Sequence, residues 1–194
     1  MSKQGWQETL ISSTADGAAL VSSTTTTSIL PAQAKLTLPA NFFSEVGKML
    51  RITATGRYGS GTASTGTINF QVNFGTLATP IIVFDSGVIA LNTGTIAANS
   101  SWKLRIDMTC RAIGGTTSAN MLSVGEWVSR ASLNESAVGT TQGVFTAMLP
   151  DTAPAAGTGF DSTITNVVDL FAKFSVSSAN QTILCHQYML ESLN

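Results

Sequence analysis

The residue types that most often carry chemistry are few in this chain and form no catalytic or metal-binding pattern. His186 is the single histidine, so neither a His-x-x-x-His pair nor a Cys/His zinc set can form. Its strand-like surroundings favour a core or interface position. Cys110 and Cys185 lack the spacing of metal ligands, which favours two buried reduced thiols. The nucleophile elbow, the phosphate-binding loop and the dinucleotide fingerprint are absent from the sequence.

Paired carboxylates are the remaining route to catalysis, because glycoside hydrolases use two of them around the scissile bond. Asp107 shares the polar face of an alternating segment with Arg105 and Arg111, so ion pairing across strands explains it. Asp151 and Asp161 flank a loop rich in Ala, Pro and Gly, where aspartate is a common turn residue. The other candidates are Asp85, Glu126 and Asp169. We therefore expect no enzymatic activity, no cofactor and no metal.

The elements that must position these side chains are β-strands, because apolar and polar residues alternate with a period of two. The clearest alternating segments are residues 50–58, 67–74, 102–113 and 168–176. Weaker strand candidates are residues 34–38, 81–85, 87–91, 121–128, 143–149 and 182–190. A single helical turn is expected at 41–47. The spacing predicts an all-β fold, an antiparallel β-sandwich of jelly-roll-like form.

The first 33 residues differ from the rest, because they are rich in Ser and Thr and poor in apolar side chains. Thr24, Thr25, Thr26 and Thr27 lie in a low-complexity run. Such a segment suits strand addition, in which main-chain hydrogen bonds supply the binding. The sequence thus predicts an extended N-terminal arm over 1–33, held by a partner such as a neighbouring subunit, and a single β-sandwich domain over 34–194.

The charge balance excludes two classes of partner. The 194 residues contain 10 Lys+Arg and 11 Asp+Glu, which gives a net charge of −1. Nucleic-acid binding needs a dense cationic surface, and a polybasic membrane anchor needs clustered positive charge. No apolar run approaches the roughly 20 residues that span a bilayer. We therefore expect neither nucleic acid nor membrane as a partner. A nearly neutral chain offers little repulsion between copies, which favours a homo-oligomer.

A few aromatic side chains are candidate partner contacts. Phe42 and Phe43 are adjacent, so a strand or short turn does not easily bury both, and Phe171 lies opposite the core face of its strand. Trp6 lies in the arm. Exposed aromatic residues often anchor protein interfaces, although a second core layer is the alternative. With the threonine run at 24–27, these residues form the predicted contact set.

Three stretches of the sequence resemble a known family. They are Leu38-Pro39-Ala40-Asn41-Phe42-Phe43 with the following Gly-Lys strand, Phe84-Asp85-Ser86-Gly87-Val88-Ile89-Ala90-Leu91, and Trp102-Lys103-Leu104-Arg105-Ile106 with its Arg-x-x-Gly ending. Together they resemble β-sandwich structural proteins encoded by tailed bacteriophages, over about 38–128. Members of this family include head-decoration and tail-associated proteins. The resemblance brings no functional residues to transfer.

The resemblance implies a structural protein of the virion, assembled in the host cytoplasm. The leading expectation is a capsid decoration (cement) protein that binds the major capsid protein or other virion proteins as an oligomer, with a trimer favoured by capsid symmetry. In this hypothesis, removing residues 1–28 abolishes binding and leaves the sandwich folded. The alternatives are a tail, fibre or baseplate component, or a carbohydrate-binding module for host adhesion with Trp127 or Trp6 exposed.

Overall fold

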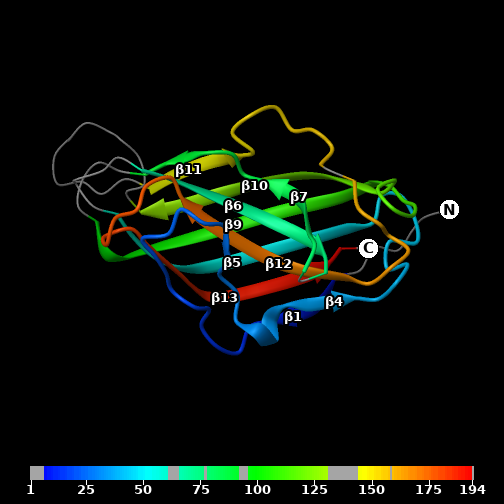
Figure 1. The fold of residues 1–194 in the computed structure, drawn as a ribbon, viewed down its shortest axis with the longest axis horizontal. Helices are drawn as coiled ribbons and strands as arrows, with labels where there is room; N and C mark the ends of the chain where they lie inside the picture. Colours follow the sequence, from blue (N-terminus) through cyan, green and yellow to red (C-terminus); the bar gives the residue numbers. More distant parts are fainter. Residues whose placement is uncertain are drawn as a thin grey trace.

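Two antiparallel β-sheets pack face to face, which confirms the expected all-β sandwich (Figure 1). The structure, a computed structural model, describes residues 7–60, 66–76, 78–91, 96–130, 144–157 and 159–193. The large sheet has the order β1-β13-β5-β9-β10-β11, with β2 also paired to β13. The small sheet has the order β3-β12-β6-β7, with β4 paired to β12 and β8 to β6. The strands are β1 Glu8–Ser12, β2 Leu20–Val21, β3 Thr27–Ser28, β4 Leu36–Leu38, β5 Met49–Ser60, β6 Thr67–Gly75, β7 Pro80–Asp85, β8 Ile89–Ala90, β9 Ile96–Ala112, β10 Asn120–Arg130, β11 Val144–Leu149, β12 Asn166–Phe174 and β13 Thr182–Ser192.

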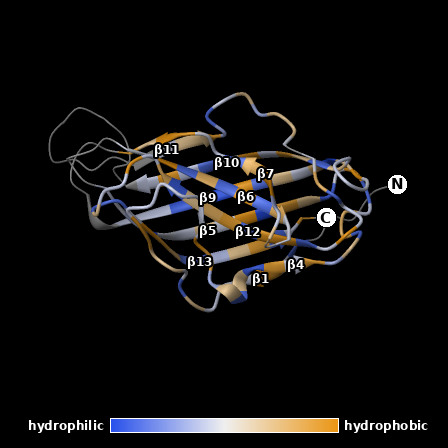
Figure 2. Ribbon diagram, in the orientation of Figure 1, coloured by the Kyte–Doolittle hydropathy of each residue, from blue (hydrophilic) through white to orange (hydrophobic). Residues whose placement is uncertain are grey.

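The alternating segments form the long central strands β5, β6, β9 and β12. Hydrophobic and hydrophilic residues follow one another along these strands in Figure 2. The apolar residues turn inward, and the centre of the core is aromatic. Trp102 and Trp127 stack with ring centroids 5.1 Å apart, and Phe70 lies 4.9 Å from Trp127. The helical turn expected at 41–47 is a series of turns instead, and the short 3-10 helix η1 lies earlier, at Ala32–Ala34.

The strand pairing is that of a jelly roll, because antiparallel pairs are nested along the chain. The first strands, β1 and β2, pair with the last, β13; next inward, β3 and β4 pair with β12; then β5 pairs with β9, and β6 with β7. The first and third of these pairs lie in the large sheet, and the other two in the small sheet. This is the rolled-up long hairpin of two Greek keys. The hairpin β10–β11 extends the large sheet beyond β9.

The described part of the N-terminal segment is built into this jelly roll, which corrects the expectation that another subunit holds it. Its strands β1, β2 and β3 pair with strands of the same chain, across both sheets. Leu20, Ile29 and Leu30 are buried in the core between the sheets. The predicted boundary at residue 33 therefore does not separate an arm from a complete sandwich, since the segment before it supplies the outer strands of both sheets.

Candidate partner-binding surface

The two lateral rims of the sandwich are closed in different ways (Figure 1). One rim, where β1 and β4 lie, is covered by short strands of the N-terminal segment. The opposite rim carries β7, β10 and β11. There β11 is the last strand of the large sheet, and within the described part of the chain it pairs with β10 alone. A row of backbone donors and acceptors is thus left along β11, which is the usual starting point for strand pairing with another chain.

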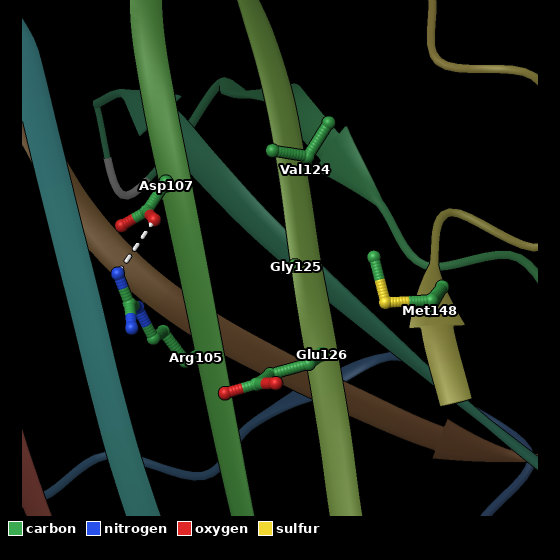
Figure 3. A pocket seen from close by; sticks show the side chains of 6 residues that line it. All are labelled: Arg105, Asp107, Val124, Gly125, Glu126 and Met148. Atoms are coloured by element: carbon green, nitrogen blue, oxygen red, sulfur yellow. Dashed lines mark hydrogen bonds and ion pairs between the residues drawn. The ribbon is translucent and has the colours of Figure 1, made fainter. Parts of the chain in front are cut away.

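A shallow depression lies on the outer face of the large sheet beside β11, over β9 and β10 (Figure 3). Met148 of β11 and Val124 of β10 form its apolar side, and these side chains are 75% and 41% exposed. In Figure 3 Met148 projects beside Gly125, and Glu126 extends from β10 toward β9. Such exposed apolar side chains next to an unpaired strand edge are typical of a protein interface.

The polar side of the depression is an ion-pair network. Asp107 contacts the Nε atom of Arg51 at 2.6 Å and an Nη atom of Arg105 at 3.1 Å. Partial burial opposes ionisation of Asp107, but the hydrogen bonds and charges of the two arginines outweigh this effect and lower its pKa. The hydrogen bond to Asp107 in turn raises the pKa of Arg51, with a smaller contribution from the charge of Glu191. The carboxylate is therefore ionised and balanced at neutral pH, a poor state for a general acid.

The two depressions lie below or at the lower end of the size of pockets that enclose a small ligand. The one beside β11 holds about 170 Å³. The second, a groove of about 290 Å³, runs between β7 and the loop at 150–157. Pockets that enclose a small ligand usually hold roughly 300–1,000 Å³. In the groove, Ser123 Oγ donates to the carbonyl of Val83, and Gly157 lies against the same carbonyl, so part of the β7 edge is occupied.

Phe42 and Phe43 face different surroundings, although the sequence grouped them. Phe43 is 2% exposed and packs against Phe74 and Phe160, so it belongs to the core and is not a surface anchor. Phe42 is half-buried against the core, with Lys48 Nζ 3.8 Å from its ring centroid. The second core layer that the sequence left open therefore holds for Phe43, and the ring of Phe42 packs edge-on against it, with centroids 5.1 Å apart and planes at 89°.

The other predicted contacts lie far from β11. Phe171 is half-buried on the outer face of the small sheet, opposite the core face of β12 as the alternation predicted. Thr24, Thr25 and Thr27 are exposed and Thr26 is half-buried, and the backbone of Thr27 pairs with Ala172 of β12. Trp6 lies outside the described residues. The structure thus does not gather the predicted contact residues into one surface.

His186 and the carboxylates form no reactive cluster in the described ranges. A bulge between Cys185 and Gln187 shifts the alternation of β13, so His186 turns outward and its Nδ1 atom contacts Asp16 at 2.9 Å. The sequence predicted a core or interface position, and the core alternative is wrong because the side chain is 38% exposed. Within the described chain, no group of three His, Cys, Asp or Glu side chains is placed to hold a metal ion, and no helix is long and apolar enough to cross a membrane. Cys110 and Cys185 are free and buried.

Sequence reasoning missed Met148 and Val124 as surface residues. Both are apolar residues in weakly alternating segments, where the inward face could not be assigned. The signal that could have found them is the composition of β11 itself. Its sequence, Val-Phe-Thr-Ala-Met-Leu, contains no charge, although it forms the edge of a sheet. A neutral edge strand is unusual because natural sheets commonly protect their edges with charged residues.

A second row of side chains crosses the outer face of the small sheet. Ser28, Phe171, Gln71 and Asp85 occupy directly opposed positions on β3, β12, β6 and β7. Gln71 Nε2 donates to Asp85 Oδ2 at 2.8 Å, and Asn69 Nδ2 donates to Asp85 Oδ1 at 2.5 Å. The row combines an aromatic ring with amide and carboxylate groups. Asp85 is exposed, but Gln71 is only 7% exposed, so the row is a shallow surface.

Comparison with known proteins gives a likeness to a solved structure. No family model matches the chain, and no curated protein matches it. Among solved structures it is similar to the CBM2 module of the evolved Dit protein of Lactobacillus casei BL23 phage J-1. The two share 13% sequence identity, the match covers 82% of this chain and 68% of that chain, and the TM-score is 0.28. A TM-score this low does not define a shared fold, so function has to be argued from the surfaces described above.

Proposed function

We propose that this chain is a non-catalytic structural protein of a tailed-bacteriophage particle, that it works by protein–protein association, and that it belongs to the tail, fibre or baseplate. The observation that carries the proposal is the neutral outer edge of β11, the last strand of the large sheet, with Met148 of this strand exposed. A surface of this kind binds another protein and offers no reactive group. The phage assignment is supported by the sequence resemblance over about 38–128.

The N-terminal segment supports the proposed place in the tail rather than on the head. The capsid-clamp hypothesis depended on a free arm that reaches into the shell. That segment is occupied within its own jelly roll, since the backbone N–H of Ile29 donates to the carbonyl of Leu170 at 3.0 Å and β1 pairs with β13. An arm that completes its own fold is a poor capsid clamp. The tail-associated members of the resembling family then fit better than the head-decoration members.

Immunogold labelling of purified phage particles tests this proposal. Antibodies raised against the purified chain should place gold on the tail or its tip. Gold distributed over the head shell would overturn the tail placement and restore the decoration hypothesis. Particles that carry no gold and yield no peptide of this chain by mass spectrometry would overturn the structural role altogether.

A second candidate function, carbohydrate binding for host adhesion, is favoured by the row that contains Phe171. A half-exposed ring can stack on the apolar face of a sugar while neighbouring amide and carboxylate groups bond its hydroxyls. The stacking platform that the sequence suggested at Trp127 is not available, because this ring is fully buried. Any sugar site among the described residues would therefore centre on Phe171 and Asp85.

A glycan array decides on this second candidate. Binding that is lost in the Phe171→Ala variant and retained in Phe42→Ala would support it, since Phe42 is a half-buried ring away from the row. Absence of binding to host-wall glycans by the wild-type chain, or binding that survives Phe171→Ala, would remove it.

A further inference from the structure

We propose that β11 pairs antiparallel with β11 of a second copy of this chain, about a two-fold axis perpendicular to the large sheet. The inference rests on the proposed function, because it names the partner of the same surface. The two large sheets would then join into one continuous sheet. Three features of the molecule support this pairing: the condition of the sheet edges, the charge near β11 and the arrangement of side chains along the strand.

The remaining edge strands each carry a feature that discourages pairing. The strand β1 contains a bulge between Thr9 and Ile11 and begins at Glu8. The strands β2 and β3 are two residues long, and β4 is three residues long between Lys35 and Pro39. Short strands, bulges, charges and prolines are the usual protections of a sheet edge.

The edge strand β7 is protected in a further way. It starts at Pro80, ends at Asp85 and has a register shift at Val83, whose carbonyl is already met by Ser123. By contrast, β11 keeps an unbroken register with β10 over Gly125–Arg130, is six residues long, and contains neither charge nor proline. Among the described strands it is the edge left open to a partner.

The charges near β11 favour a second copy over a charged partner. The strand itself is neutral, so it offers no counter-charge to an acidic or basic peptide. The charged positions opposite β11 on the outer face of β10 are Glu126, across from Met148, and Arg130, across from Val144. Strands in a sheet lie about 4.8 Å apart, so each of these positions and its copy would be separated by at least three such spacings, about 14 Å. This exceeds the Debye length of about 8 Å at physiological salt, so the two copies do not repel each other strongly.

The side chains of β11 suit pairing with themselves. Under this symmetry each residue faces a residue that lies on the same side of the sheet. Two registers are considered. In the first, the axis passes through Ala147, and Thr146 of one copy faces Met148 of the other on the outer face. In the second, the axis passes through Thr146, and the two copies of Thr146 face each other. Met148, at 75% exposure, would lose water contact on pairing. An edge that is neutral and apolar on its outer face thus finds its complement in a second copy.

Sedimentation velocity with matched charge variants tests the pairing. The full chain should sediment at twice its 20.2 kDa mass at micromolar concentration. Thr146→Lys places a charge on the exposed face of β11 and should weaken the dimer at least tenfold. Thr37→Lys introduces the same charge at an exposed position of β4, on the opposite rim, and should leave the dimer intact. Circular dichroism confirms that both variants fold.

A wild-type chain that stays monomeric up to hundreds of micromolar would overturn the proposal, as would a trimer, or a dimer unaffected by Thr146→Lys. Oxidation of Thr146→Cys, or of the double variant Thr146→Cys with Met148→Cys, should give a disulfide-linked dimer, because one of the two registers brings these positions together. Absence of both cross-links would exclude pairing through β11. The sedimentation and cross-linking experiments use the purified chain and do not depend on the phage particle. If immunogold labelling places the chain on the tail while the purified chain is monomeric, the proposed function stands and only this inference is removed.

Discussion

Ile29 and Leu170 are joined by a backbone hydrogen bond of 3.0 Å, with the side chains of both fully buried in the core. This contact places the end of the Ser/Thr-rich segment between the two sheets. It makes residues 7–33 a structural part of the jelly roll. The consequence is that the segment cannot be removed without loss of the fold.

We predict that deletion of residues 1–28 unfolds the chain, since it removes β1, β2 and β3 from both sheets. A smaller change, Ile29→Ala, should lower the free energy of unfolding by about 3 kcal/mol, because it leaves a cavity in the core. The control Thr24→Ala removes an exposed side chain and should change stability by less than about 0.5 kcal/mol. Urea denaturation followed by circular dichroism measures all three. A truncated chain with the wild-type midpoint would contradict the fold as described.

Trp127 should be the most costly aromatic residue to truncate. It stacks on Trp102 and contacts the rings of Phe70 and Tyr58, and it is fully buried. Trp127→Ala should lower the free energy of unfolding by about 4 kcal/mol, whereas Trp127→Phe keeps part of the packing and should cost less. Denaturation curves followed by far-ultraviolet circular dichroism provide the measurement. Equal losses in the two variants would mean that ring packing is not what the tryptophan contributes.

Alternation in the sequence predicted the central strands because a single face of each is buried. In β5, β9 and β12 the apolar residues recur at every second position and lie on one face of the sheet. A period of two in the sequence is therefore enough to identify these strands. The strands β1, β2 and β3 could not be found in this way. Leu20 and Ile29 are isolated apolar residues among Ser and Thr, and their burial depends on a pairing with strands more than a hundred residues later.

The orientation of His186 and the candidate surface at β11 could not be predicted from the alternation of residues. The bulge in β13 moved His186 out of phase with Tyr188, and no residue type in that strand announces it. The candidate surface depends on which strand ends the sheet, a property of topology. Met148 is on the outer face of the sheet, and its exposure of 75% exceeds the 41% of Val124 on β10 because β11 is last in the order.

The two cysteines should be unreactive in the folded protein. Burial, with a smaller contribution from the charge of Asp16, raises the pKa of Cys185 to about 12, and burial raises the pKa of Cys110. The thiolate is the reactive form, so at pH 8 the reaction of Cys185 with a thiol reagent should be at least about 1,000-fold slower than that of free cysteine. In guanidinium chloride both thiols should react at the free rate. Rapid labelling of either cysteine in the native protein would show that its strand is accessible.

Stability should fall at acidic pH through Asp107. Its pKa in the folded protein lies below the ordinary value of 3.8, so the unfolded chain takes up the proton first as pH falls. The contribution of the ionised carboxylate is therefore complete above about pH 5 and is lost as pH falls below 3.8 and through the lowered folded pKa. Asp107→Asn should reduce the free energy of unfolding by about 1 kcal/mol at pH 7, because Arg51 and Arg105 lose their counter-charge.

The difference between wild type and Asp107→Asn should shrink as pH falls below 3.8 and through the lowered folded pKa of Asp107, where the wild-type carboxyl also takes up a proton. Urea denaturation of both proteins between pH 2 and pH 7 measures this convergence. The control Glu8→Gln removes an exposed carboxylate at the start of β1 and should follow the wild-type curve. A constant gap between wild type and Asp107→Asn across the whole range would mean that the network stabilises the sheet by packing and not by charge. The outer face of β9 would then owe its order to the strand ladder alone.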